Sequence, residues 1–102
     1  MKLLDIRTST SKGKKLMAIF CKCSGCTKCK PNERKVVHFG QSGYSDYTIH
    51  KDEKRRSAYR ARHATGKNAP ADTPNALAYH LLWGDSTSLQ QNIKAFKKRY
   101  GV

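Results

Sequence analysis

Apolar and polar residues alternate in the first half of the chain with the period of two that is typical of β-strands. The pattern is strongest in residues 14–21 and is shorter in residues 3–6 and 35–39. Residues 22–34 join the second and third of these segments and read as a long loop. We therefore expect three short strands, the second and third of which pair antiparallel as a hairpin.

The second half of the chain changes to the spacing of three and four residues that is typical of amphipathic helices. Residues 51–63 are expected to form the first helix, because acidic residues near its start suit the positive end of the helix dipole. Thr73 followed by Pro74 predicts the start of a second helix, which ends at Gly84. A serine at position 86 or 88 caps the last helix.

The order of these elements predicts an α+β fold. A small antiparallel sheet of about three strands in the N-terminal half is expected to pack with about three helices in the C-terminal half. The 102 residues fit one domain, so residues 1–102 are expected to form a single basic α+β domain with a Cys-rich hairpin loop at 21–34.

Targeting and membrane signals are missing from the sequence. No apolar run approaches the ~20 residues of a membrane helix, and the first residues lack the apolar stretch of a signal peptide. These patterns predict a soluble protein that has no membrane partner and is made in a reducing compartment.

Positive charge dominates the composition. Lysine and arginine total 21 residues against 7 aspartates and glutamates, which gives a formal net charge of +14. Self-repulsion of this size opposes a compact fold unless a polyanion screens it, and nucleic acid is the commonest polyanion. We therefore predict that the chain binds the phosphate backbone of DNA, or of RNA. The alternative interpretation is a solvated basic surface without a specific partner.

Two basic clusters supply the candidate phosphate contacts. The first surrounds Tyr59 on the expected helix at 51–63, where arginine side chains suit pairs of phosphate oxygens. Its alternative is an ordinary solvated helix whose Tyr59 packs inward. The second cluster closes the last helix, where cations also stabilise the negative end of the helix dipole. No module that reads bases is evident, so binding is expected to be sequence-nonspecific. The candidate nucleic-acid-binding residues are Lys51, Lys54, Arg55, Arg56, Arg60, Arg62, Lys94, Lys97, Lys98 and Arg99.

Four cysteines, Cys21, Cys23, Cys26 and Cys29, fall within nine residues of the expected hairpin loop. Zinc prefers thiolate ligands in a tetrahedral arrangement, so this cluster predicts one structural zinc ion as the cofactor of the domain. The same spacing leaves two alternatives open, disulfide bonds and free thiols. No other cofactor is expected.

The loop at residues 40–47 is the one segment whose composition suggests an active site, because Tyr44 and Asp46 are followed by His50. With a nearby arginine these groups could support metal-dependent cleavage of a phosphodiester. The structural alternative is that Asp46 caps a turn while the tyrosines pack their rings. The nuclease fold with such a pattern also needs a late glutamate, and no acidic residue follows Asp85. We therefore expect no enzymatic activity and no catalytic residues.

Several short segments of the chain form an ordered set. They are Val37-His38-Phe39-Gly40, Tyr44-Ser45-Asp46-Tyr47-Thr48-Ile49-His50-Lys51-Asp52, Tyr59, Arg62-His63, Leu81-Leu82-Trp83-Gly84 and Lys97-Lys98-Arg99-Tyr100. This set resembles a family of small basic virion-associated proteins of large and giant double-stranded DNA viruses, including Marseillevirus-like ones. The resemblance covers about residues 14–100, and the cysteine cluster departs from it by lengthening a hairpin.

The resemblance implies a late protein that is packaged in the virion with the genome and has no established enzymatic activity. Its expected location is the virion and, during infection, the host cytoplasm or nucleus. Together with the charge, this favours a genome-associated, DNA-binding protein. The alternative is a structural virion or capsid-associated protein that binds acidic protein surfaces and forms a homodimer through its helices. A metal-dependent nuclease is the third alternative.

Overall fold

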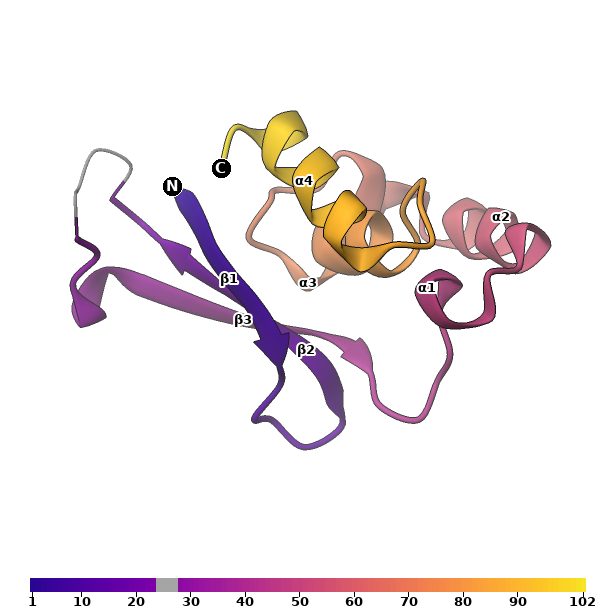
Figure 1. Cartoon of the computed structure of the whole chain (residues 1–102), viewed down its shortest axis with the longest axis horizontal. Helices are drawn as coiled ribbons and strands as arrows, with labels where there is room; N and C mark the ends of the chain where they lie inside the picture. The colour runs from indigo at the N-terminus through magenta and orange to yellow at the C-terminus, as the bar shows by residue number, and fades with distance from the viewer. Residues whose placement is uncertain (24–27) are drawn as a thin grey trace.

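The computed structural model shows a three-stranded antiparallel sheet followed by a group of helices, and it describes residues 1–23 and 28–102 (Figure 1). The strands are β1 (Lys2–Thr8), β2 (Lys14–Cys21) and β3 (Arg34–Gln41), paired in the order β1-β2-β3. The expected α+β class is confirmed, with the sheet in the N-terminal half and the helices after it. β1 and β3 extend beyond their apolar patterns, because polar residues at their ends also pair with β2.

The central strand β2 aligns the apolar side chains of the sheet on one face. Its register pairs Ala18 with Ile6 of β1 and Val37 of β3, and pairs Phe20 with Leu3 of β1. Directly paired residues point to the same face of a sheet, so these side chains form one continuous apolar surface. Leu3, Ala18 and Phe20 are at most 1% exposed, so this face is the one that the helices cover.

One short helical turn, η1 (Pro31–Glu33), lies between β2 and β3, and the other helical segments follow β3. These are α1 (Tyr47–His50), α2 (Glu53–Arg62), η2 (Ala64–Lys67), α3 (Pro74–Leu77), η3 (Ala78–Leu82) and α4 (Leu89–Tyr100). The side chains of Asp52, Thr73 and Ser88 accept backbone amide hydrogen bonds at the starts of α2, α3 and α4, respectively. Of the helices in residues 1–23 and 28–102, none is long and apolar enough to cross a membrane.

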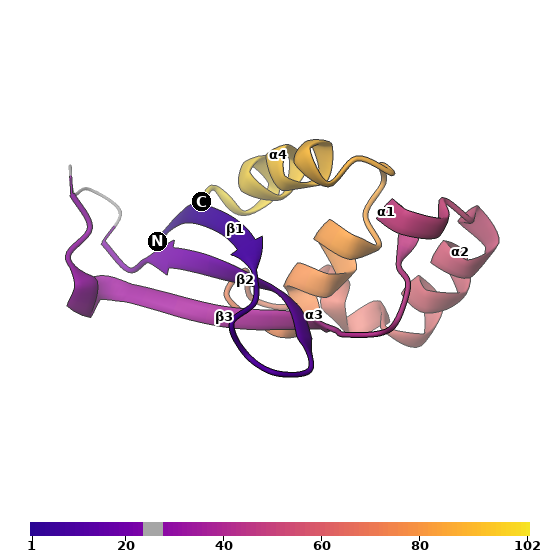
Figure 2. The same cartoon turned by 60° about the horizontal axis from the view of Figure 1, so that its bottom comes forward.

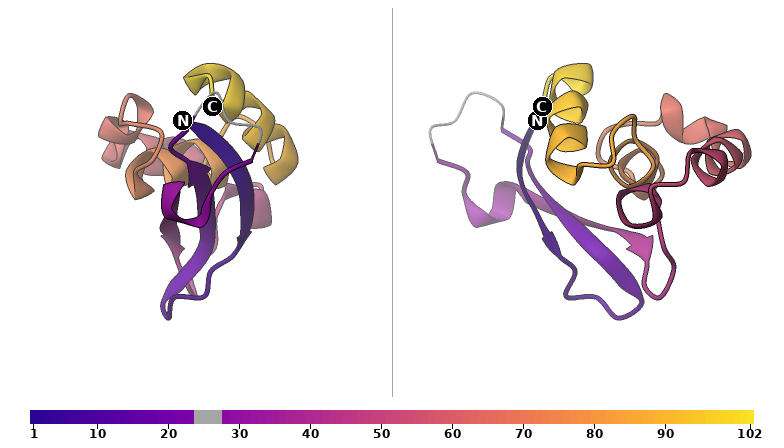
Figure 3. Two further views of the ribbon diagram at one scale, coloured as in Figure 1. Left: turned by 90° about the vertical axis from the view of Figure 1, so that its left-hand side faces the viewer. Right: turned by 45° about the vertical axis from the view of Figure 1, so that its right-hand side comes forward.

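The helices α3 and α4 lie over one face of the sheet (Figures 2 and 3). Leu77, Leu81 and Phe96, each at most 1% exposed, pack in one core with Phe20 and Phe39 of the strands. α1 and α2 lie beyond the end of the sheet, at the opposite end of the molecule from the hairpin between β2 and β3 (Figure 1). The core therefore leaves α2 at the periphery.

η3 is a π-helix, which the sequence pattern did not predict. The backbone amide of Trp83 donates to the carbonyl of Ala78, five residues earlier, at 3.1 Å. π-helical turns are rare and occur frequently at functional sites. The apolar spacing of Leu77 and Leu81 fits an α-helix equally well, so the pattern carries no signal for the wider turn.

The cysteine-rich hairpin contains a disulfide bond between Cys21 and Cys29, which is one of the three states that the sequence left open. In this state these two sulfur atoms do not serve as zinc thiolates. Cys26 lies outside the described residues. Within the described part of the chain, no group of three His, Cys, Asp or Glu side chains could hold a metal ion. The four-cysteine zinc site stays a prediction for the reduced chain.

Candidate nucleic-acid interface

One face of α2 is attached to the loop that follows η3, although every residue of this helix is at least partly exposed. Arg56 donates from Nε to the carbonyl oxygen of Gly84 at 2.7 Å and from Nη2 to the carboxylate of Asp85 at 2.7 Å. Arg60 donates from Nη1 to the same carboxylate at 3.1 Å. Its guanidinium also lies 4.8 Å from the ring centroid of Tyr79. Both arginines were predicted phosphate contacts, and the structure gives both of them internal partners that hold α2 in place.

The remaining predicted cations of this region lie on the surface. Lys51, Lys54 and Arg62 are exposed. The Arg55 side chain is 66% exposed, and its Nε lies 3.8 Å from the carboxylate of Asp52. An exposed ion pair of this length contributes little to stability, so Arg55 can exchange Asp52 for another anion.

The second predicted cluster, on α4, also contains both exposed cations and a cation with a partner inside the protein. Lys94 and Lys98 are exposed, while Lys97 is half-buried. Arg99 donates from Nη2 to the carbonyl oxygen of Lys67 at 2.9 Å. This bond ties the C-terminal end of α4 to η2.

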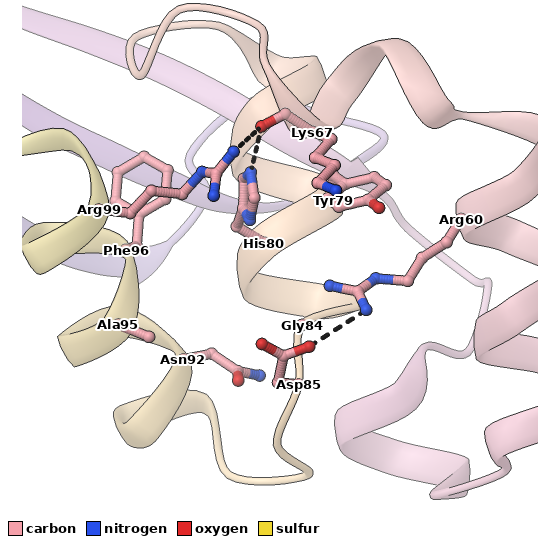
Figure 4. Close-up of a pocket in the computed structure, with 10 residues that line it drawn as sticks. All are labelled: Arg60, Lys67, Tyr79, His80, Gly84, Asp85, Asn92, Ala95, Phe96 and Arg99. Atoms are coloured by element: carbon pink, nitrogen blue, oxygen red, sulfur yellow. Dashed lines mark hydrogen bonds and ion pairs between the residues drawn. The ribbon is translucent and has the colours of Figure 1, made fainter.

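A cavity of about 380 Å³ lies between α2, η3 and α4, and the two predicted clusters meet there (Figure 4). Arg60 approaches it from α2 and Arg99 from α4, with His80 of η3 between them. Lys67 adds a third permanent cation, and Asp85 is the one carboxylate in the lining. The cavity is therefore net positive.

One donor of the Arg60 guanidinium has no partner within the fold. Its Nε is buried and makes no hydrogen bond among the described residues, so an anion would reach it only after this side chain moves. A buried donor without a partner is costly, and an arginine fork can bind two oxygens of one phosphate. The chemistry of this lining therefore suits an oxyanion.

His80 contributes polarity to the cavity rather than charge. Burial lowers the pKa of His80, and the guanidinium groups of Arg99 and Arg60 lower this pKa further. The hydrogen bond of its Nε2 with the carbonyl oxygen of Lys67, at 2.9 Å, and the carboxylate of Asp85 act in the opposite direction. The imidazole is therefore neutral at neutral pH.

The scaffold of the cavity depends on Asn92, a buried polar residue on α4 that the sequence analysis missed. Its Nδ2 donates to the carbonyl oxygens of Leu81 at 3.0 Å and Ser86 at 2.8 Å, and its Oδ1 accepts from the amide of Ser86 at 3.0 Å. Gly84 packs against the same bend, where an added Cβ would lie 2.2 Å from the carbonyl oxygen of His80. The sequence did contain a signal for this role of Asn92, because its amide side chain falls within the apolar stripe of the last helix.

The loop after β3 is anchored by Asp46, which is 2% exposed. Its carboxylate accepts from the backbone amide of Thr48 at 2.9 Å, from the Thr48 hydroxyl, and from Nζ of Lys15 at 2.7 Å. Asp46 is the N-cap of α1, as the structural alternative for this loop predicted. The contacts of this carboxylate with the described residues are therefore structural.

Comparison with known proteins gives one match. The model of a family of unknown function, DUF5754, matches residues 4–63, which include most of the sheet, the Asp46 loop and α2. The π-helix and α4 lie beyond the matched segment. No curated protein and no solved structure matches the chain.

Proposed function

We propose that this chain, which belongs to the DUF5754 family of unknown function, binds the phosphate backbone of nucleic acid without reading the base sequence. The cations on the outer faces of α2 and α4 make most of the contacts, and the cavity between these helices holds one phosphate. The motifs that resemble those of small basic virion proteins extend this proposal to packaging with a viral genome.

The observation that carries the proposal is that the aspartates are paired with cations of the same chain, while other cations on α2 and α4 stay exposed. Each of the five aspartates lies 2.6 to 3.8 Å from a lysine or arginine of the same chain. These carboxylates are therefore engaged within the protein. Lys54, Arg62, Lys94 and Lys98 remain exposed on α2 and α4. A surface with this excess of cations attracts a polyanion at long range.

Titration of a labelled random duplex, followed by fluorescence anisotropy at several salt concentrations, tests the proposal. If six to ten phosphates are neutralised, affinity should fall by roughly 10³ to 10⁵ between about 50 and 200 mM salt. No binding even at the lowest salt concentration would overturn the proposal.

A matched pair of double variants tests whether binding is localised to the helices. Lys54→Gln with Lys98→Gln removes one exposed cation from each helix. The negative slope of log affinity against log salt should become shallower by about 2. Lys22→Gln with Lys30→Gln removes the same charge from the hairpin at the other end of the molecule, and should leave the slope unchanged. Equal effects of the two variants would contradict an interface on α2 and α4.

A further inference from the structure

A second cavity, of about 390 Å³, lies between the loop after β3, α2 and η3. Its volume falls within the range of roughly 300–1,000 Å³ that small-molecule sites occupy. Leu82 and Ala78 of η3 give it apolar walls, and Tyr44, Tyr59 and Trp83 add aromatic ones. This cavity is thus suited to a flat, largely apolar group.

Tyr44 is the aromatic residue of this lining whose ring is exposed and not stacked. It is 66% exposed, and its ring stacks on no other ring among the described residues. A turn places it there: the Tyr44 amide donates to the carbonyl of Gln41 at 3.3 Å, and Gly43 supplies the positive φ of 87° that the third turn position favours. An aromatic ring held at a cavity mouth by a tight turn keeps its faces free for a ligand.

The opposite wall is a fixed stack of rings. Tyr59 lies parallel to Trp83, with centroids 4.3 Å apart and an interplanar angle of 7°, and His63 stacks on Tyr59 at 4.2 Å. His50 lies 5.2 Å from Trp83. Two near-parallel neighbours at these distances occupy both faces of Tyr59. A ligand therefore meets the edges of this stack, and Tyr44 is the ring on which it can lie flat.

We propose that this cavity takes one unstacked nucleobase of a single-stranded nucleic acid. The base stacks on Tyr44, and the exposed guanidinium of Arg62, which also lines the cavity, binds the adjoining phosphate. A base within a duplex is paired and stacked on both faces, so it cannot enter, whereas a single strand offers its bases to aromatic side chains. This inference rests on the proposed function and adds to it a preference for single strands over duplex.

The test compares two labelled ligands of the same length, a single strand of about 12 nucleotides and the matching duplex, at one salt concentration. Wild-type protein should bind the single strand more tightly. Tyr44→Ala should weaken single-strand binding by about 5- to 150-fold, which is the usual effect of removing one base–aromatic stack. It should leave duplex binding unchanged. Tyr44→Phe keeps the ring and should retain single-strand affinity.

Trp83 gives a second readout, because it is the one tryptophan of the chain and lines the cavity. Its fluorescence should change on single-strand binding and stay constant on duplex binding. Thermal unfolding of Tyr44→Ala shows whether the exposed substitution leaves the fold intact.

The possible failures are distinguishable. Equal affinity for both ligands, or a Tyr44→Ala loss that is the same for both, would overturn the nucleobase site while leaving phosphate-backbone binding in place. Absence of binding to either ligand would overturn both proposals.

Discussion

Replacing Asn92 by alanine removes the side chain that bridges the end of η3 to the start of α4. Three backbone groups lose a partner: the carbonyl of Leu81 and both the amide and the carbonyl of Ser86. The bond to Leu81 is buried, and a buried polar group without a partner costs about 1–3 kcal/mol. The two bonds to Ser86 are partly buried, so water can replace them at a loss of roughly 0.5 kcal/mol each.

The free energy of unfolding of Asn92→Ala should therefore fall by about 2–4 kcal/mol, out of the roughly 5–15 kcal/mol that stabilises a typical domain. The melting temperature should fall by about 8–32 °C, because 1 kcal/mol corresponds to roughly 4–8 °C for a domain of this size. Urea unfolding followed by Trp83 fluorescence measures the first quantity, and circular dichroism on heating measures the second.

The neighbouring Gln91→Ala variant is the matched control, since it also removes an amide side chain from α4 but at an exposed position. Its free energy of unfolding should stay within about 0.5 kcal/mol of wild type. If Asn92→Ala behaved like this control, the bridge would not hold the segment from η3 to α4, and the reasoning from its three hydrogen bonds would be refuted.

Three further predictions concern charged groups. Asp85→Asn removes the carboxylate shared by two arginines of α2, so the free energy of urea unfolding should fall by about 1 kcal/mol. Anisotropy should show tighter duplex binding, because a negative charge is lost beside these arginines. Weaker binding would contradict the proposed interface. Asp46→Ala leaves Lys15 without its buried partner and should reduce the free energy of unfolding by about 3 kcal/mol, at the low end for buried pairs because Lys15 reaches solvent. The folded-state pKa of His80 lies below its ordinary value of 6.5, so the unfolded chain binds this proton more readily. The contribution of His80 to the free energy of unfolding should therefore be constant above about pH 6.5 and fall as the pH decreases from there. Urea unfolding at a series of pH values should show a smaller fall for His80→Gln than for wild type.

Local signals in the sequence were sufficient for most of the fold. The alternation in residues 14–21 predicted β2 over its full length, because half of its side chains face the helices. Thr73 marked the start of α3, since a side-chain oxygen there satisfies free backbone amides. The start of α4 was predicted at Ser86 or Ser88, and the structure has Ser88 as the cap. α1 and the π-helical turn were not predicted. The cap of α1 is local, because Asp46 accepts from the amide of Thr48, but the glycines and serines of residues 40–47 read as a loop. The spacing of Leu77 and Leu81 fits an α-helix as well as a π-helix.

The candidate site was predictable only as a set of charges. Arg56 and Arg60 share one side of α2 with Tyr59, and nothing in their spacing distinguishes them from Arg55 and Arg62. Their inward orientation follows from partners at Gly84 and Asp85, more than twenty residues later. The sequence therefore identified the cations of the surface but not which of them hold the fold together. For the same reason the cavity between α2 and α4 could not be predicted.

The extra width of η3 gives this segment room for one residue more than an α-helical turn holds. Trp83 donates to the carbonyl of Ala78 over five residues, whereas an α-helix makes this bond over four. Deleting one of the four residues between them would let Trp83 keep the same bond in α-helical geometry, so Gly84 and Asp85 would still point toward α2. Inserting one residue would instead turn everything after it by about 100°, which would move Gly84 and Asp85 away from the arginines of α2.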